Sequence, residues 1–168
     1  MLPINETIEF SQSPEAVAAM YADPQYAEIR KQELTADWAT AYVNGTPEAG
    51  FTTTTEFAMP TDRAPQMVQS VIGSSVTVHE AQTWEAAGAD GRREGRAEIT
   101  VKGTPAVVSA HYRLEPSAGG SVLTVTGELS AQVPLVGKRI EKAAEPYVAQ
   151  VFGVEQRAAQ RYFAERED

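Results

Sequence analysis

The feature that most constrains the fold is a long amphipathic segment over residues 135–165, near the end of the chain. Apolar residues recur there at steps of three and four, the spacing of one face of an α-helix. At 1.5 Å per residue the segment predicts a helix of about 45 Å. Such a helix needs an equally long apolar surface to cover. The predicted stripe consists of Val136, Ile140, Ala143, Ala144, Tyr147, Val151, Val154, Ala158 and Tyr162.

The preceding residues predict that surface, because most of them alternate apolar and polar side chains as strands do. A first strand at 4–10 is followed by two short helices, which begin at Ser13-Pro14-Glu15 and at Asp23-Pro24. In both, a capping residue precedes proline at the first helical position. Regular turn signals then predict an antiparallel meander. Its strands are expected at about 38–43, 51–59, 75–85, 92–102, 106–115 and 121–132, with a turn at Asn44-Gly45 and a short helix at 63–71.

Composition excludes several classes of protein. The chain has 168 residues, 14 Lys and Arg against 23 Asp and Glu, and a net charge of −9, so we expect no nucleic-acid partner. It has no cysteine, which excludes disulfides and thiol chemistry. The start lacks the pattern of a signal peptide, and no apolar run is long enough to span a bilayer. We expect a single domain over 1–168 in the cytoplasm, without stable membrane insertion.

The predicted order of elements resembles the helix-grip fold of the START-like superfamily, which includes the birch-pollen allergen, START lipid-transfer domains and polyketide cyclases. The resemblance is carried by residues 13–17 (SPEAV), by Thr83-Trp84 and by residues 133–142 (VPLVGKRIEK). These stretches are most similar to an actinobacterial START-like family of unknown function. The resemblance implies an α+β fold: a curved antiparallel sheet of six or seven strands grips the long helix over a hydrophobic cavity. It identifies no catalytic residues.

The residues themselves also favour a cavity, because small side chains occur on both facing layers. The alternative is that Trp38, Trp84, Tyr112 and Tyr147 fill this space, since protein interiors are close-packed. An aromatic wall would suit a ligand with an apolar body and a few polar groups. The candidate ligand-binding residues are Trp38, Phe57, Glu80, Trp84, Ala110, Tyr112, Gly127, Tyr147, Val151 and Arg157.

Glu80 is the most informative of these candidates. It shares strand parity with Val78 and Trp84, which predicts that its carboxylate points inward. A buried carboxylate needs a partner or a proton. Arg157 lies in the helical stripe, where its guanidinium could pair with Glu80. In the alternative, a β-bulge turns Glu80 to solvent and Arg157 reaches past the edge of the helix.

Signatures of catalysis are few. His79 and His111 fall on the outward faces of their strands, and two histidines lack a third ligand, so we expect no metal and no cofactor. Neither Gly-x-Ser-x-Gly nor Gly-x-Gly occurs. We therefore favour non-catalytic binding or transport of a hydrophobic or amphiphilic small molecule, such as a lipid, an isoprenoid or an aromatic metabolite. The alternative is a polyketide cyclase or dehydratase-like enzyme with Glu80 as general base.

A third hypothesis is a protein-interaction module, which the polar outward residues of the strands disfavour. Homodimerisation through strand edges stays open.

Overall fold

The elements follow the predicted order in a computed structural model that describes residues 1–62, 64–66, 69–70 and 73–166, apart from the side chain of Tyr147. The helix expected at 63–71 falls largely outside the described residues. In chain order the elements are β1 (Leu2–Phe10), α1 (Pro14–Tyr21), α2 (Pro24–Leu34), β2 (Trp38–Thr46), β3 (Gly50–Pro60), β4 (Ser75–Trp84), β5 (Arg93–Val101), β6 (Ala106–Ser117), β7 (Gly120–Ala131) and α4 (Gly137–Ala164).

The two short helices begin where their capping residues predict. Ser13 precedes α1, and its Oγ accepts a hydrogen bond of 3.2 Å from the Ala16 amide. Asp23 precedes α2, and its Oδ1 accepts one of 2.9 Å from the Gln25 amide. Each bond satisfies an amide that a helix leaves unpaired at its start. The long helix α4 continues through Pro146.

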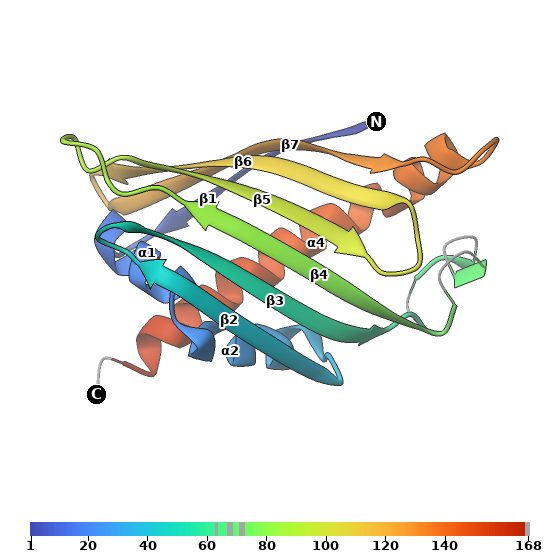
Figure 1. Cartoon of the computed structure of the whole chain (residues 1–168), viewed down its shortest axis with the longest axis horizontal. Coiled ribbons are helices and arrows are strands. Elements are labelled where there is room, and N and C mark those ends of the chain that lie inside the picture. Colours follow the sequence, from blue (N-terminus) through green and yellow to red (C-terminus); the bar gives the residue numbers. More distant parts are fainter. Residues whose placement is uncertain (63, 67–68, 71–72, 167–168) are drawn as a thin grey trace.

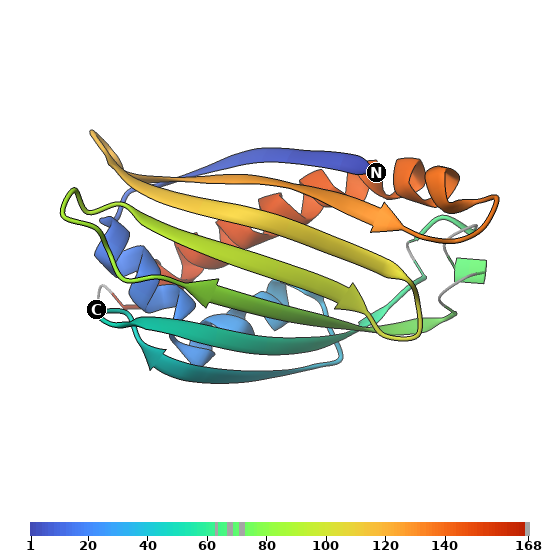
Figure 2. The ribbon, with the colours of Figure 1, turned by 45° about the horizontal axis from the view of Figure 1, so that its top comes forward.

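The strands that the structure describes form one antiparallel sheet in the order β1-β7-β6-β5-β4-β3-β2, which confirms the expected α+β architecture. Consecutive strands pair from β2 to β7, and β1 pairs with the outer side of β7. β1 and β2 are therefore the two edge strands of the described sheet. Figures 1 and 2 show the sheet curving around α4, with α1 and α2 also on its concave side. Within the described residues, no helix is long and apolar enough to cross a membrane.

The turn predicted at Asn44-Gly45 was wrong. Both residues continue β2, where Asn44 is opposite Thr52 and Gly45 is opposite Phe51, and the chain turns at 47–49 instead. Gly45 has a φ of 98°, and a Cβ on it would collide with the carbonyl of Gly50. The glycine therefore serves a close approach of two strands and not a hairpin turn.

The core is most compact around Trp84, whose side chain is 1% exposed. Its ring stacks on Tyr21 at a centroid distance of 5.3 Å and tilts against Tyr112 at 5.6 Å. Gly95 on the neighbouring strand lies under this ring, because a Cβ there would come within 2.7 Å of it. These contacts pack one end of the space between sheet and helices.

Candidate ligand cavity between sheet and helix

A cavity of about 260 Å³ lies between the inner face of the sheet and α4. It exceeds the roughly 150 Å³ of an apolar cavity that accommodates benzene, so the two layers leave room for more than a few waters. Apolar side chains dominate its wall. Those that line it are Ile4, Leu34, Phe57, Met59, Val78, Ile99, Val108, Ala110, Tyr112, Leu129, Ala144, Val148, Val151, Phe152 and Val154, together with the charged Arg30, Glu80 and Glu155.

The space arises from how the helices rest on the sheet. α4 contacts β1 and β7, whereas α2 contacts β2, β3 and α4. The middle strands β4, β5 and β6 face the gap between these two lines of contact, and each contributes lining residues. Small side chains such as Ala110 on β6 and Ala144 on α4 leave the gap unfilled.

Glu80 lies on the inner face of β4, as the strand parity predicts. Its Oε1 accepts hydrogen bonds from both terminal nitrogens of Arg30, at 3.0 and 2.9 Å. Gln82 Nε2 donates a third bond to the same oxygen at 3.1 Å. Gln82 in turn accepts a bond of 2.9 Å from the indole of Trp84, so the ion pair is tied to the aromatic core.

Arg30 comes from α2 and is the cation at this end of the cavity. Its guanidinium lies 4.9 Å from the ring centroid of Phe57 and 5.4 Å from that of Tyr26. Such contacts let aromatic rings stabilise a buried cation. Burial by itself lowers the pKa of Arg30, but the Glu80 carboxylate beside it raises that pKa above its ordinary value. Arg30 is therefore a permanent positive charge.

Glu155 on α4 is the second carboxylate of the cavity, and it is 9% exposed. The hydroxyl of Tyr21 donates a 3.0 Å hydrogen bond to its Oε1, and the hydroxyl of Tyr26 donates one of 3.3 Å to its main-chain carbonyl. Burial raises the pKa of Glu155, and the negative charge of Glu80 adds to this effect. The charge of Arg30 and the bond from Tyr21 lower the pKa by less.

The raised pKa of Glu155 predicts a pH effect on stability. The folded state binds this proton more tightly than the unfolded state, so the stability that it contributes is fully present below the ordinary pKa of 4.5. That contribution is lost as the pH rises through the folded pKa. As the pH rises from about 4.5 through the folded pKa, we expect wild type to lose more stability than Glu155→Gln.

Denaturant unfolding of both proteins across this pH range measures the difference. Carboxylates whose pKa values are lowered, such as Asp23 and Glu141, affect both proteins equally and cancel. Parallel stability curves for the two proteins would show that Glu155 does not titrate differently in the folded state.

The cavity brings together half of the predicted ligand-binding residues. Phe57, Glu80, Ala110, Tyr112 and Val151 all line it, although Val151 is 48% exposed and lies at its edge. The side chain of Tyr147 is outside the described part of the structure. Ligand binding by any of these residues stays a prediction, as does the alternative role of Glu80 as general base.

Two of the aromatic residues predicted to bind a ligand, Trp38 and Trp84, do not line the cavity. Trp38 is 43% exposed on the outer face of β2, because its neighbour Ala39 is opposite the inward Phe57. Successive side chains of a strand point to opposite faces, so Trp38 cannot reach the cavity. Trp84 points inward, but it belongs to the aromatic core and is not among the lining residues.

The roles predicted for Gly127 and Arg157 also need correction. Gly127 lets β6 and β7 approach closely, because a Cβ there would collide with the Ser109 carbonyl and the Ala110 Cα. The Arg157 side chain is 60% exposed and forms a 3.7 Å ion pair with Glu33 Oε2 outside the cavity. The partner predicted for Glu80 was therefore wrong, and Arg30 takes that place.

Neither Arg30 nor Glu155 was among the candidate ligand-binding residues predicted from the sequence. The buried face of α4 includes Val148, Phe152, Glu155 and Ala159, which continue one another at three- and four-residue steps. A stripe centred on these residues would have placed Glu155 inside it. In α2, Tyr26, Ala27 and Leu34 lie three or four residues from Arg30, so the same helical spacing would have marked Arg30 as inward.

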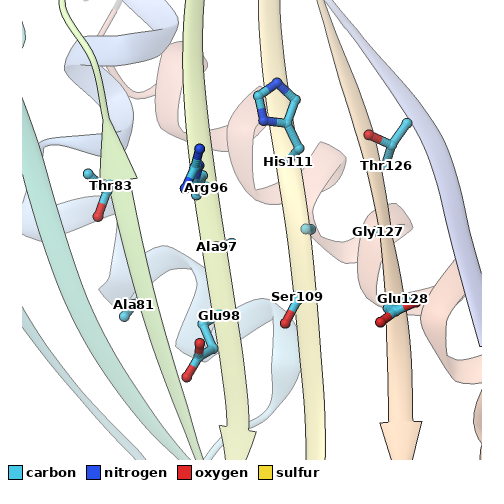
Figure 3. Close-up of a pocket in the computed structure, with 11 residues that line it drawn as sticks. Ala81, Thr83, Arg96, Ala97, Glu98, Ser109, His111, Thr126, Gly127 and Glu128 are labelled. Carbon is cyan, nitrogen blue, oxygen red and sulfur yellow. The ribbon is translucent and has the colours of Figure 1, made fainter. Parts of the chain in front are cut away.

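The outer face of the sheet carries an open groove with polar walls. Figure 3 shows Thr83, Arg96, His111 and Thr126 side by side on four strands, with the helices behind the sheet. His111 Nε2 contacts Glu94 Oε2 here, and His79 Nδ1 lies 3.6 Å from Glu56 Oε1 on the same face. Both histidines thus point away from the cavity, as their strand parity predicts.

The fold is that of START-like helix-grip proteins, as solved structures show. A START superfamily protein from Mycobacterium smegmatis has a TM-score of 0.53 at 12% identity, covering 94% of this chain and 97% of that one. A STAR-related lipid transfer protein (fragment 25-204) from Xanthomonas axonopodis has a TM-score of 0.54 at 14% identity, covering 92% and 83%. The protein TTHA0849 from Thermus thermophilus reaches 0.57 at 15% identity, covering 95% and 97%.

Residues 5–163 match the family described as "Protein of unknown function (DUF2505)". The chain belongs to this family. Among curated proteins no relative matches it.

Proposed function

We propose that this protein binds a hydrophobic or amphiphilic small molecule in the cavity between sheet and α4. The observation that carries the proposal is the shape and chemistry of this cavity. Its wall is apolar except for one charged group formed by Arg30, Glu80 and Glu155. Ligand sites commonly combine an apolar wall with a few placed polar groups, which orient the ligand. The similar fold of a lipid transfer protein from Xanthomonas axonopodis supports the same class of ligand.

Binding would be driven by burial of apolar surface, at about 25 cal/mol per Å² removed from water. The charged group contributes specificity more than affinity, because Arg30 and Glu80 already pair with each other. Native mass spectrometry of the purified protein tests for a co-purified small molecule. A thermal-shift panel of lipids, isoprenoids and aromatic metabolites on the delipidated protein tests for binding directly.

A bulky residue in the cavity should abolish binding. Ala144→Trp places an indole where the ligand would lie, since Ala144 lines the cavity from α4. A ligand present at 100 times its Kd stabilises the wild type by about 2.7 kcal/mol, and we expect the variant to lose that stabilisation. Ala149→Trp on the exposed side of the same helix is the matched control and should retain it. Equal ligand stabilisation in both variants, or no binding by wild type, would refute the proposal.

A further inference from the structure

The charged end of the cavity has unequal numbers of positive and negative groups. Two carboxylates, Glu80 and Glu155, line it, whereas Arg30 is the one cation among the described lining residues. We infer that the cavity selects amphiphiles with a cationic head group, such as an amine, over anionic amphiphiles with the same apolar body. This inference rests on the proposed function, because it specifies the ligand class for the same site.

The positive charge of Arg30 is already engaged. Both of its terminal nitrogens donate to Glu80 Oε1, and its guanidinium packs between the rings of Tyr26 and Phe57. An anionic head group would have to share this cation with Glu80. It would also bring a third negative charge close to two buried carboxylates, where charges interact more strongly than in water.

Glu155 is the carboxylate that forms no ion pair with a described residue, although the charge of Arg30 partly offsets its own. Its Oε1 accepts a bond from the neutral hydroxyl of Tyr21, and no described Lys or Arg forms an ion pair with it. A buried carboxylate without a cation is costly. An ammonium head group would supply the missing charge and hydrogen-bond donors, while its alkyl or aromatic body fills the apolar part of the cavity.

The test compares three ligands that share one alkyl chain and differ in head-group charge: decylamine, decanol and decanoate. Each is titrated below its micellar concentration into the delipidated full-length protein, at about pH 7.5 and physiological salt, which screens the net charge of −9. Calorimetry gives the affinities. We expect decylamine to bind about tenfold more tightly than decanol, and decanoate to bind more weakly than decanol.

Glu155→Gln removes the negative charge and keeps the shape of the side chain. It should therefore lower the affinity for decylamine about tenfold. The affinity for decanol should change by less than about twofold. Glu145→Gln makes the same charge change on the exposed side of α4 and should leave all three affinities unchanged. Ala144→Trp should block all three ligands, which separates binding in the cavity from attraction to the acidic surface.

The outcomes distinguish this inference from the proposed function. Decanol equal to decylamine, or decanoate as the tightest ligand, would overturn the inference and leave hydrophobic binding intact. Failure of all three to bind, with no co-purified molecule, would overturn the proposed function itself. If Glu155→Gln does not fold, the ranking of the three ligands on the wild-type protein decides the question alone.

Discussion

Replacing Arg30 with methionine is expected to destabilise the protein by about 3–5 kcal/mol, because it leaves two buried carboxylates without a cation. Arg30 provides two of the hydrogen bonds to Glu80 Oε1 and the positive charge that offsets Glu155. Methionine preserves most of the apolar contact with Phe57 and Tyr26, so the loss reports charge and hydrogen bonding more than packing.

The measurement is the free energy of unfolding in urea at neutral pH. Arg157→Met is the matched control, since that side chain is 60% exposed and its ion pair with Glu33 lies outside the cavity. Exposed pairs of this kind contribute about 0–1 kcal/mol. If Arg157→Met cost as much as Arg30→Met, the assignment of Arg30 as the structural partner of Glu80 would be wrong.

Replacing Trp84 with alanine is expected to lower the free energy of unfolding by about 3–5 kcal/mol, because it creates a cavity in the aromatic core. Trp84 stacks on Tyr21, contacts Tyr112 and donates its indole hydrogen to Gln82. Gln82 also donates to Glu80, so the substitution leaves one acceptor of this buried chain unpaired.

Trp38→Ala is the control for Trp84→Ala, because Trp38 lies on the outer face of the sheet and is 43% exposed. We expect it to cost less than about 1 kcal/mol. The two variants also separate stability from binding: Trp84 does not line the cavity, so folded Trp84→Ala at low temperature should still bind the wild-type ligand. Equal costs for the two variants would contradict the strand parity that the structure shows.

Strand parity alone was sufficient to place Glu80 on the inner face, because a two-residue period leaves one choice once Val78 and Trp84 are assigned. The same rule failed for Trp38. Both faces of β2 carry apolar residues, so nothing in that strand distinguishes the face of Trp38 and Tyr42 from that of Ala39 and Ala41. The register with β3 makes the choice, and Ala39 opposite Phe57 turns Trp38 outward.

Side-chain periodicity, capping residues and turn signals were enough to predict the order of elements, the starts of α1 and α2, the meander and the long covering helix. Each of these features depends on residues that are close together in the sequence. The charged end of the cavity depends on contacts across the fold. Arg30 is 50 residues from Glu80, and Tyr21 is 134 residues from Glu155. Their meeting follows from how α2 and α4 lie against the sheet. The apolar residues of α2 are centred on the face of Arg30 and not on that of Lys31, which indicates the cation that turns inward. They do not indicate that this cation meets Glu80, because that contact is set by the packing of α2 against distant strands.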